Sequence, residues 1–563
     1  MSEAEELIEL IRSSLIGDDE AVAGPFGPRR VTYADYTASG RSLGFIEDYI
    51  RNAVMPLYAN THTESSGTGL QTTRFREDAR RIVREALGGN EDDHALIFCG
   101  SGSTGAVDKL VAILNLRIPA DLNDRYHLLD AIPAGERPVV FVGPFEHHSN
   151  ELPWRESIAD VVTIHEDADG HIDLAQLEQK LHEYAGRPLK IGSFSAASNV
   201  TGIVSDTHAI SSLLHKHGAL SLWDFAAAAP YVEVEMDPHR DGDRLDYKDA
   251  IFLSPHKLIG GPGTPGVLLI RRDLLHNRVP AVVGGGTVAY VNPEEHVYLS
   301  DSEHREEGGT PAILESIRCG LVFQLKEQVG VPAIREREEA FIRRAIERWE
   351  RHPNIEILGN RRAERLSIVS FVVRYGPQYL HHNYVVAVLN DLFGIQSRGG
   401  CSCAGPYGHR LLGIDLERSH EFEREISRGC EGIKPGWVRV NFNYFIDEQV
   451  FDFILEAVEI VASDGWKLLP QYRFTAETGL WRHAAGAAEP PLSLADISYR
   501  DGRMTYSAHR HREPVSRLTD YLREARSMLA SPSANGWKAE DPPDLDADFE
   551  TLRWFPLPTE VAP

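Results

Sequence analysis

In the stretch Ala250-Ile251-Phe252-Leu253-Ser254-Pro255-His256-Lys257, an apolar strand runs directly into a lysine, and this is the most informative feature of the chain. A Gly-rich turn, Gly260-Gly261-Pro262-Gly263, follows. Desolvation at such a strand end would destabilise the lysine ammonium, so that the neutral amine can act as a nucleophile. A solvated surface lysine has the same local sequence. The other strand ends of the chain must therefore distinguish the two interpretations.

A second apolar run, His94–Cys99, leads into Gly100-Ser101-Gly102-Ser103-Thr104-Gly105 and then into a helical pattern. Glycines at a helix start let backbone N–H groups approach an anion, and the helix dipole adds its positive end. Ser103 and Thr104 add hydroxyl donors. The pattern is neither a dinucleotide fingerprint nor a Walker A loop, because no Lys-Ser/Thr pair follows. It predicts a phosphate cradle, with a plain glycine turn as the alternative.

Three further apolar runs also end in polar residues: Val139–Val142 before His147, Leu189–Phe194 before Asn199, and Leu220–Trp223 before Asp224. Helical stretches separate most of these runs, which predicts a mainly parallel sheet. Ligands of open α/β sheets bind outside the carboxyl ends of the strands. We therefore expect the lysine, the cradle and these polar side chains to converge on one crevice.

This set of side chains fits pyridoxal 5′-phosphate (PLP). Asp224 can keep the pyridinium nitrogen protonated, which makes the ring an electron sink, and Lys257 can form the Schiff base. His147 can stack on the ring face, and Asn199 can donate to the 3′-oxygen. Each side chain alone also has a structural explanation, such as a helix cap or a core histidine. Their shared placement favours the cofactor.

The chain resembles the class V aminotransferase-like PLP enzymes of fold type I, and within them the cysteine desulfurases and the PLP domain of molybdenum cofactor sulfurases. The resemblance extends from about Tyr33 to Val461, and the motifs that carry it are Glu146–Trp154, Ser198–Gly202, Asp224–Ala227, Ser254–Lys257, Gly309–Pro311 and Arg398–Pro406. It implies an α/β protein with a large, mainly parallel seven-stranded-type sheet domain and a smaller α/β domain. It also implies a homodimer, with the phosphate surrounded by Ser103, Thr104, Ser254 and His256 and reached by Thr310 of the neighbouring subunit.

One position departs from the desulfurase pattern. Those enzymes usually carry a glutamine three residues after the pyridinium aspartate, and here that position is Ala227. The 3′-oxygen of the cofactor would therefore have one donor fewer.

A second chemical centre lies at Cys401-Ser402-Cys403, shortly after a predicted helix that Gly394 ends. Zinc sites more often use a Cys-x2-4-Cys pair with a second pair elsewhere, so we expect no metal. A disulfide between Cys401 and Cys403 would be strained. Gly399-Gly400 is expected to form a flexible link that lets the loop reach the substrate. Cys401 fits either a relay or resolving thiol or a small structural residue.

The resemblance gives the residues around this loop specific roles. Arg398 would grip the substrate carboxylate, and Cys403, five residues later, would accept the substrate sulfur. Arg439 occupies the place of another arginine near the substrate. A buried structural cysteine on a Gly-rich loop remains the alternative for Cys403.

The implied function is that of a PLP-dependent, cysteine desulfurase-like sulfurtransferase. It would remove sulfur from L-cysteine, leave alanine, and carry the sulfur as a persulfide on Cys403, with Lys257 and His147 as the other catalytic residues. A sulfur-acceptor protein is an expected partner. A class V aminotransferase, epimerase or C–S lyase acting on another amino acid would use the same Lys257, Asp224 and His147 but would make Cys403 incidental. An inactive scaffold would have no need of Lys257.

The composition fits a cytoplasmic enzyme. The formal charge of −26, from 84 acidic and 58 basic side chains, argues against nucleic acid or an anionic membrane as a partner. There is no run of about 18 apolar residues, and the first residues are acidic where a signal peptide would be basic. Five cysteines, an odd count, fit free thiols in a reducing compartment.

We expect four segments. These are an N-terminal helical arm (1–30), a large PLP-binding domain (31–322), a small α/β domain with the cysteine loop (323–463) and a C-terminal extension of unknown role (464–563). The extension carries four tryptophans, which predicts that parts of it pack on the protein: Trp466, Trp481, Trp537 and Trp554. The extension is too short for the additional domain of molybdenum cofactor sulfurases, which disfavours that particular function.

Overall fold

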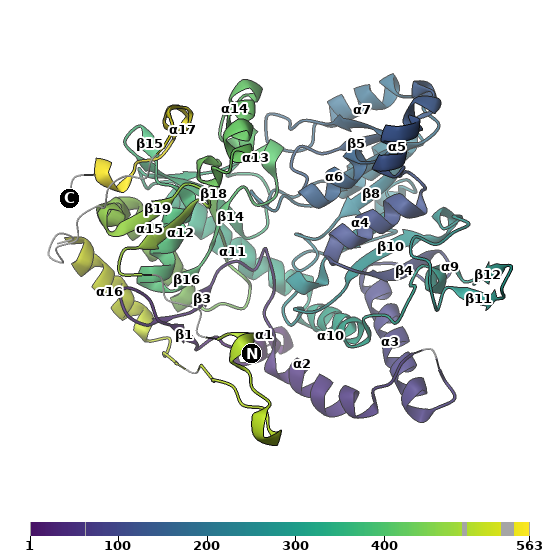
Figure 1. The fold of residues 1–563 in the computed structure, drawn as a ribbon, viewed down its shortest axis with the longest axis horizontal. Helices are drawn as coiled ribbons and strands as arrows, with labels where there is room; N and C mark the ends of the chain where they lie inside the picture. Colours follow the sequence, from purple (N-terminus) through teal and green to yellow (C-terminus); the bar gives the residue numbers. More distant parts are fainter. Residues whose placement is uncertain (1, 62, 487–491, 510, 531–544, 562–563) are drawn as a thin grey trace. The chain divides into compact units, whose positions relative to one another are not determined.

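The computed structural model describes residues 2–61, 63–486, 492–509, 511–530 and 545–561. The chain divides into two units (Figure 1). The first comprises Met1–Ile16, Tyr36–Arg337 and Arg362–Leu366, and the second comprises Gly17–Asp35, Glu338–Arg361 and Ser367–Pro563. The expected N-terminal arm is therefore shared between the two units, and the expected C-terminal extension belongs to the second. Among the described residues, no helix is both long and apolar enough to cross a membrane.

The first unit is built on a sheet in which the described residues form seven strands, in the order β4-β10-β9-β8-β7-β5-β6. The strands are β4 (His94–Cys99), β5 (Val139–Val142), β6 (Asp160–Thr163), β7 (Lys190–Ser195), β8 (Leu220–Asp224), β9 (Ala250–Leu253) and β10 (Gly266–Arg271). Strands β5 to β9 pair in parallel, whereas β10 is antiparallel to β4 and to β9. The predicted mainly parallel sheet is confirmed. The antiparallel β10 is an element that the sequence analysis did not assign.

Helices pack on this sheet, and most of its strand residues are buried, as parallel sheets require, whereas β6 at one edge is only partly buried. Every residue of β4, β5 and β9 is buried. Helix α4 (Gly102–Ile113) packs on β4, β9 and β10, and α8 (Thr207–Lys216) packs on β8. The other helices of this unit are α1 (Glu3–Ser13), α2 (Gly44–Tyr49), α3 (Gly67–Ala86), α5 (Ala120–Tyr126), α6 (Leu152–Arg155), α7 (Leu174–Glu183), α9 (Ser302–Arg305) and α10 (Ile313–Val329). A two-stranded ribbon of β11 (Val288–Val291) and β12 (His296–Tyr298) completes it.

Strand β10 fixes the start of α4. The N–H of Gly266 donates to the carbonyl oxygen of Gly100 at 2.8 Å. A Cβ at Gly266 would lie 2.0 Å from the carbonyl oxygen of Gly102, so only glycine fits there. The loop that follows β4 is thereby held against the first residue of β10.

The second unit contains a smaller sheet whose described strands have the order β13-β14-β18-β17, with β15 beside β14. Their bounds are β13 (Ile355–Ile357), β14 (Ile368–Tyr375), β15 (Gln378–Tyr379), β17 (Arg398–Gly400) and β18 (Trp437–Asn441). Short pairs are formed by β1 (Ala21–Val22) with β2 (Arg29–Arg30), β3 (Thr32–Tyr33) with β16 (Ile395–Gln396), and β19 (Tyr472–Thr475) with β20 (Leu480–His483). The helices are α12 (His382–Phe393), α13 (Gly405–Leu411), α14 (Leu416–Ser427), α15 (Glu448–Asp464), α16 (Arg517–Ala530) and α17 (Ala547–Leu552), and α11 (Val331–Trp349) begins in the first unit and ends in this one.

Helix α12 ends where the sequence predicts. Gly394 follows it with φ of 71°, and a Cβ there would lie 2.1 Å from the carbonyl oxygen of Arg30. The glycine is therefore needed both for the left-handed turn and for the close approach of the two backbones.

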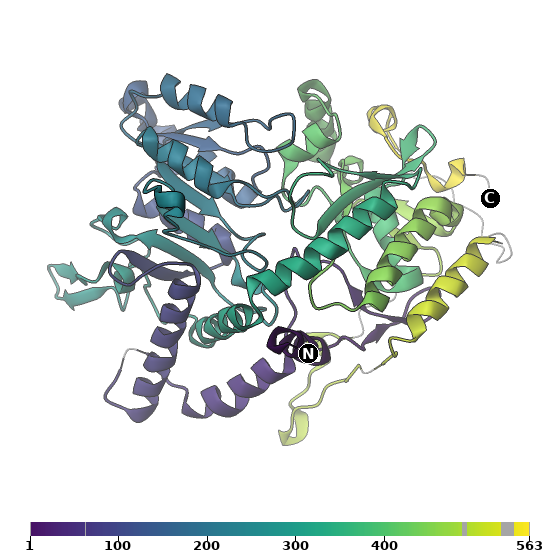
Figure 2. The same ribbon diagram turned by 180° about the vertical axis from the view of Figure 1, so that it is seen from behind.

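The C-terminal extension packs on the rest of the second unit. Figure 2 shows α16 running beside α15, and the two helices are in contact. Trp554 stacks on His381 with ring centroids 5.2 Å apart, and Trp481 lies 5.1 Å from the ring of Tyr384. Trp466 contacts Tyr375. The predicted packing of these three tryptophans is confirmed, and Trp537 lies outside the described residues.

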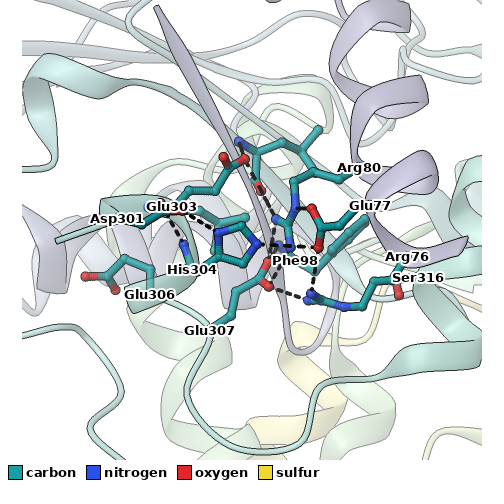
Figure 3. Close-up of polar contacts among 12 residues, drawn as sticks. Arg76, Glu77, Arg80, Phe98, Asp301, Glu303, His304, Glu306, Glu307 and Ser316 are labelled. Atoms are coloured by element: carbon teal, nitrogen blue, oxygen red, sulfur yellow. Dashed lines mark hydrogen bonds and ion pairs between the residues drawn. The ribbon is translucent and has the colours of Figure 1, made fainter. Parts of the chain in front are cut away.

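Strand β4 lies at the edge of the large sheet, and charged side chains cap its outer backbone groups (Figure 3). Glu303 accepts a hydrogen bond from the N–H of Leu96 at 2.7 Å, and Glu307 accepts one from the N–H of Phe98 at 2.7 Å. Arg80 donates to the carbonyl oxygen of Leu96. These bonds satisfy groups that an edge strand would otherwise leave open.

The charges of this cap are nearly balanced within the protein. Arg80 pairs with Glu307 at 2.8 Å, and Arg84 pairs with Glu303 at 2.6 Å, all with buried side chains. Burial raises the pKa of Glu307, but the charges and hydrogen bonds of Arg80 and Arg76 outweigh it and bring the pKa to about 2. Glu307 therefore stays ionised, and the stability that it contributes is lost only as the pH falls below its unfolded-state value and through about 2.

Replacing Glu307 by glutamine is expected to lower the free energy of unfolding of the first unit by about 3–5 kcal/mol, because it leaves buried guanidinium charge without a partner. Urea denaturation followed by circular dichroism measures the loss. Glu448→Gln is the control, since its pair with Arg344 in the second unit is exposed and its loss should cost no more than about 1 kcal/mol. Equal losses for the two variants would contradict a buried, structural charge cap.

Candidate functional site

The loop after β4 and the loop after β9 meet at a tight polar cradle. The N–H of Ser103 donates to the hydroxyl of Ser254 at 2.8 Å. Gly102 has φ of 56°, and a Cβ there would lie 2.6 Å from the Ser254 hydroxyl. The hydroxyl of Thr104 is hydrogen-bonded to that of Ser149 at 2.7 Å. The start of α4 therefore gathers hydroxyl and N–H groups in the way that a phosphate requires.

Two histidines flank this cradle. The N–H of Ser149 donates to Nδ1 of His147 at 3.1 Å, which leaves the proton of the neutral ring on Nε2. Burial, together with the charge of Lys257, lowers the pKa of His256 to about 4. His256 is therefore neutral at physiological pH, and Lys257 follows it in a short 3-10 turn at the end of β9.

Asp224 ends β8 as a buried carboxylate. Its Oδ1 accepts a hydrogen bond from the N–H of Ala226 at 2.8 Å. Burial raises its pKa to about 6, against the lowering effects of this bond and of the Lys257 charge. Among the described residues, no basic side chain lies within ion-pair distance of it. A cationic ring nitrogen would supply the counter-charge, so this carboxylate fits a pyridinium.

Glu146 is a second buried carboxylate, and the sequence alone predicted no role for it. It accepts hydrogen bonds from the N–H of Ser195 at 2.9 Å and from the side-chain amide of Asn150 at 2.6 Å. Ser195 is the register partner of Asp224. Burial raises the pKa of Glu146 to about 7, and the Asp224 charge adds to the effect. Its place shortly after an apolar strand was the signal that could have identified it.

The other predicted residues of the first unit lie as follows. Asn199 is buried in the turn after β7. Ala227, in place of the family's glutamine, is also buried. Thr310 is exposed before α10 and accepts a hydrogen bond from Asn60 at 3.3 Å. The structure thus brings Ser103, Ser254 and His256 together at the cradle and leaves Thr310 accessible.

In the second unit, the cysteine loop follows directly from β17. Gly399 and Gly400 are residues of that strand, paired with Val438 and Trp437 of β18. A Cβ at Gly399 would lie 2.6 Å from Oδ1 of Asn383. The expectation that these glycines form a flexible link is wrong, because both are paired in a sheet, and Gly399 also allows close packing.

The loop itself has an unusual backbone. Ser402 and Cys403 have φ of 51° and 57°, in the left-handed region that residues other than glycine rarely adopt. Such conformations cost on the order of 1–3 kcal/mol each and cluster at functional sites. Immediately after them, α13 begins at Gly405.

The five cysteines are free thiols, as expected, but only Cys403 is exposed. Burial raises the pKa of Cys99 to about 12 and that of Cys319 still further, so both stay protonated. Burial and the charge of Glu425 raise the pKa of Cys430. Cys401 is partly buried. Cys403 is therefore the most accessible thiol, and it interacts electrostatically with the guanidinium of Arg439.

Arg398 and Arg439 face each other in the pairing of β17 with β18. Both bind one carboxylate that the sequence analysis did not foresee, that of Asp35: Nε of Arg398 lies 2.9 Å from Oδ2, and a terminal nitrogen of Arg439 lies 3.0 Å from Oδ1. Arg439 is buried, and burial lowers its pKa. The only signal for Asp35 was its place at the start of the family resemblance.

Comparison with known proteins identifies the class. The family model of class-V aminotransferases matches residues 32–418, so the chain belongs to the class-V aminotransferase family. Enzymes of this family depend on PLP. The cradle, the buried Asp224 and Lys257 at the end of β9 are the residues of this structure that fit the cofactor.

Several similar proteins carry a more specific name than the family, that of cysteine desulfurase. The chain is 27% identical over 386 residues to a probable cysteine desulfurase of Staphylococcus aureus, covering 67% of this chain and 84% of the relative. Among solved structures, it resembles a cysteine desulfurase of Thermococcus onnurineus with a TM-score of 0.61 and 22% identity, covering 81% of this chain and 98% of the other. The cysteine desulfurase CsdA of Escherichia coli has a TM-score of 0.61 and 20% identity, covering 80% and 97%. These structures show that the fold is that of fold type I PLP enzymes.

Asp224→Asn is expected to leave the fold intact and to weaken PLP retention by at least about tenfold, because a neutral amide cannot balance a pyridinium charge. Gel filtration followed by absorbance measurement of bound cofactor provides the readout, with circular dichroism as the check on folding. Asp206→Asn, which removes the charge of the exposed N-cap residue of α8 but keeps a capping side chain, is the control. Full cofactor retention by Asp224→Asn would show that another group balances the ring.

Proposed function

We propose that this protein is a cysteine desulfurase that takes sulfur from L-cysteine, releases alanine and holds the sulfur as a persulfide on Cys403. The observation that carries the proposal is the cysteine loop: an exposed thiol in a strained turn, five residues after Arg398 and within the electrostatic reach of buried Arg439. An aminotransferase would have no use for this arrangement. The names of the relatives support the same activity.

The first unit would hold the cofactor. Lys257 would attach it through Nζ, the cradle of Ser103, Thr104, Ser254 and His256 would bind the phosphate, and His147, Asn199 and Asp224 would hold the ring, as the resemblance implies. When bound, PLP supplies the electron sink that stabilises negative charge on the substrate carbons. Glu146, whose pKa is raised to about 7, would ionise less readily than Asp224, whose pKa is about 6, so Asp224 would be the main counter-charge of the ring nitrogen.

The second unit would hold the substrate carboxylate and transfer the sulfur. Arg398 would bind the carboxylate, with Arg439 as the second cation near it. The thiolate of Cys403 would attack the substrate sulfur, so that an S–S bond forms while the C–S bond breaks and its electron pair stays on carbon. His147 would then deliver the proton that completes alanine. Cysteine and the enzyme thiol thus give alanine and a persulfide without any external oxidant.

The persulfide would be passed to an acceptor, and an acceptor protein is the natural partner because Cys403 is exposed. A homodimer follows from the same family pattern, with Thr310 reaching the neighbouring subunit's cofactor. Thr310 is exposed, as this role requires.

Reduction with borohydride is expected to fix the cofactor on Lys257, because only a covalent C=N bond to an amine is trapped in this way. The visible band of the protein should disappear, and peptide mass spectrometry should place the added mass on the peptide that contains Lys257. Lys257→Ala should bind PLP without becoming modified. A label on another lysine would overturn the assignment.

Cys403→Ser is expected to abolish persulfide and to lower alanine formation from L-cysteine by at least about a hundredfold, since the hydroxyl is a poor acceptor of sulfur. Cys401→Ser is the matched variant two residues away and should keep both products. Single-turnover assays of alanine, pyruvate and protein-bound persulfide provide the measurement. The reverse pattern would assign the persulfide to Cys401. Full turnover in both variants, with pyruvate and ammonia, would make the enzyme a lyase.

A further inference from the structure

Asp35 is held in place by backbone contacts on both sides. Strand β3 pairs in parallel with β16, which directly precedes β17. The N–H of Ala34 donates to the carbonyl oxygen of Gln396 at 3.0 Å, and the carbonyl oxygen of Ala34 accepts from the N–H of Asn441 at 2.9 Å. The residue before Asp35 is thus fixed between the segments that carry Arg398 and Arg439.

The carboxylate of Asp35 resolves a repulsion between two like charges. Arg398 and Arg439 are opposite each other in the register of β17 and β18, and each binds a different oxygen of Asp35, at 2.9 and 3.0 Å. The Asp35 side chain is 12% exposed, and that of Arg439 is 4% exposed. A buried guanidinium without a partner is strongly unfavourable, so Asp35 supplies the charge that lets Arg439 stay in the sheet.

Asp35 binds Arg398 only through Nε, so the two terminal guanidinium nitrogens can bind a ligand. The side chain of Arg398 is 45% exposed, and its Nε is bound to Asp35. Among the residues that the structure describes, none accepts a hydrogen bond from its two terminal nitrogens. These nitrogens form the edge of the guanidinium that binds a carboxylate through two parallel bonds. Fixing Nε restricts a side chain that otherwise loses considerable rotamer entropy when it binds a ligand.

We propose that Asp35 is a positioning residue for substrate recognition: it pins Arg398 by Nε and neutralises Arg439, so that the pair of arginines presents one net positive charge and one free edge to a single α-carboxylate. This inference rests on the proposed function, because it assigns Arg398 to the carboxylate of the amino-acid substrate. Asp35 itself does not contact the substrate. Its effect is exerted through Arg398.

The test compares holoenzyme variants in binding as well as in turnover. Asp35→Asn keeps the shape of the side chain but removes its charge, and it is expected to raise KM for L-cysteine and the Kd for L-alanine by about tenfold or more, with kcat changed by less than about threefold. L-Alanine binding is measured by isothermal titration calorimetry. PLP content and the visible spectrum should stay as in the wild type, because the cofactor residues lie in the first unit. Asp18→Asn is the matched control, since Asp18 pairs with Arg30 in the same N-terminal segment and should leave both constants within about twofold.

A double-mutant cycle separates positioning from a general structural effect. Arg398→Lys alone should raise the Kd for L-alanine, and adding Asp35→Asn to it should raise the Kd by no more than about twofold further, because the residue through which Asp35 acts is already lost. Factors that simply multiply would overturn the proposal. A lower Kd in Asp35→Asn would also overturn it, since Asp35 would then compete with the substrate for Arg398.

A second variant and the wild-type activity distinguish failure of the positioning role from failure of the desulfurase function. Asp35→Glu serves as a second variant if Asp35→Asn is not recovered folded. It keeps the charge but displaces the carboxylate by one methylene, so it is expected to raise the Kd for L-alanine by a smaller factor. An unchanged Kd would contradict the positioning role of Asp35.

If the wild-type enzyme releases no alanine from L-cysteine, the desulfurase function fails. The calorimetric cycle still decides the role of Asp35, because L-alanine carries the carboxylate and no sulfur.

Discussion

The parallel register of β7, β8 and β9 determines where the polar groups of the first unit lie. It places Ser195 opposite Asp224, and Asp224 opposite Phe252, so that the strands end at one edge. Glu146 is tied to this edge through Ser195, and Lys257 lies one short turn beyond it. Since successive side chains of a strand point to opposite faces, a slip of one residue would turn Asp224 away from the lysine. The chemistry of the first unit is therefore determined by strand pairing rather than by any single loop.

The same unit contains buried carboxylates of two kinds, and their electrostatics distinguish structure from function. Glu307 is surrounded by arginines, which bring its pKa to about 2 in spite of burial. Asp224 has no comparable partner, and its pKa rises to about 6. The first carboxylate is a compensated part of the sheet edge (Figure 3), whereas the charge of the second is only partly offset, by the N–H of Ala226 and the charge of Lys257, and a cationic ligand would stabilise it further. In this unit, a carboxylate with a raised pKa and no paired cation indicates a binding site, whereas one whose pKa is lowered by buried arginines is structural.

The sequence predicted most of the large sheet because its parallel strands are short apolar runs followed by polar residues. It did not predict β10, since an apolar run does not reveal its direction, and the close approach of Gly266 to Gly102 depends on the folded backbone. Asp35 was missed for a related reason: 363 positions separate it from Arg398, and no local pattern announces an ion pair over that distance. The glycines of β17 were misread because a glycine that permits packing has the same local sequence as one that permits movement.

In the second unit, the predicted substrate-binding and sulfur-accepting groups lie around one buried arginine, Arg439. Arg439 pairs with Asp35, and its guanidinium also interacts electrostatically with Cys403. Asp35 offsets the cost of burying the Arg439 guanidinium. Asp35 also pairs with Arg398, so the three charged groups together carry one net positive charge. The exposed edge of Arg398 and the exposed thiol of Cys403 are the two places where that charge can act on an anionic ligand or a nucleophile.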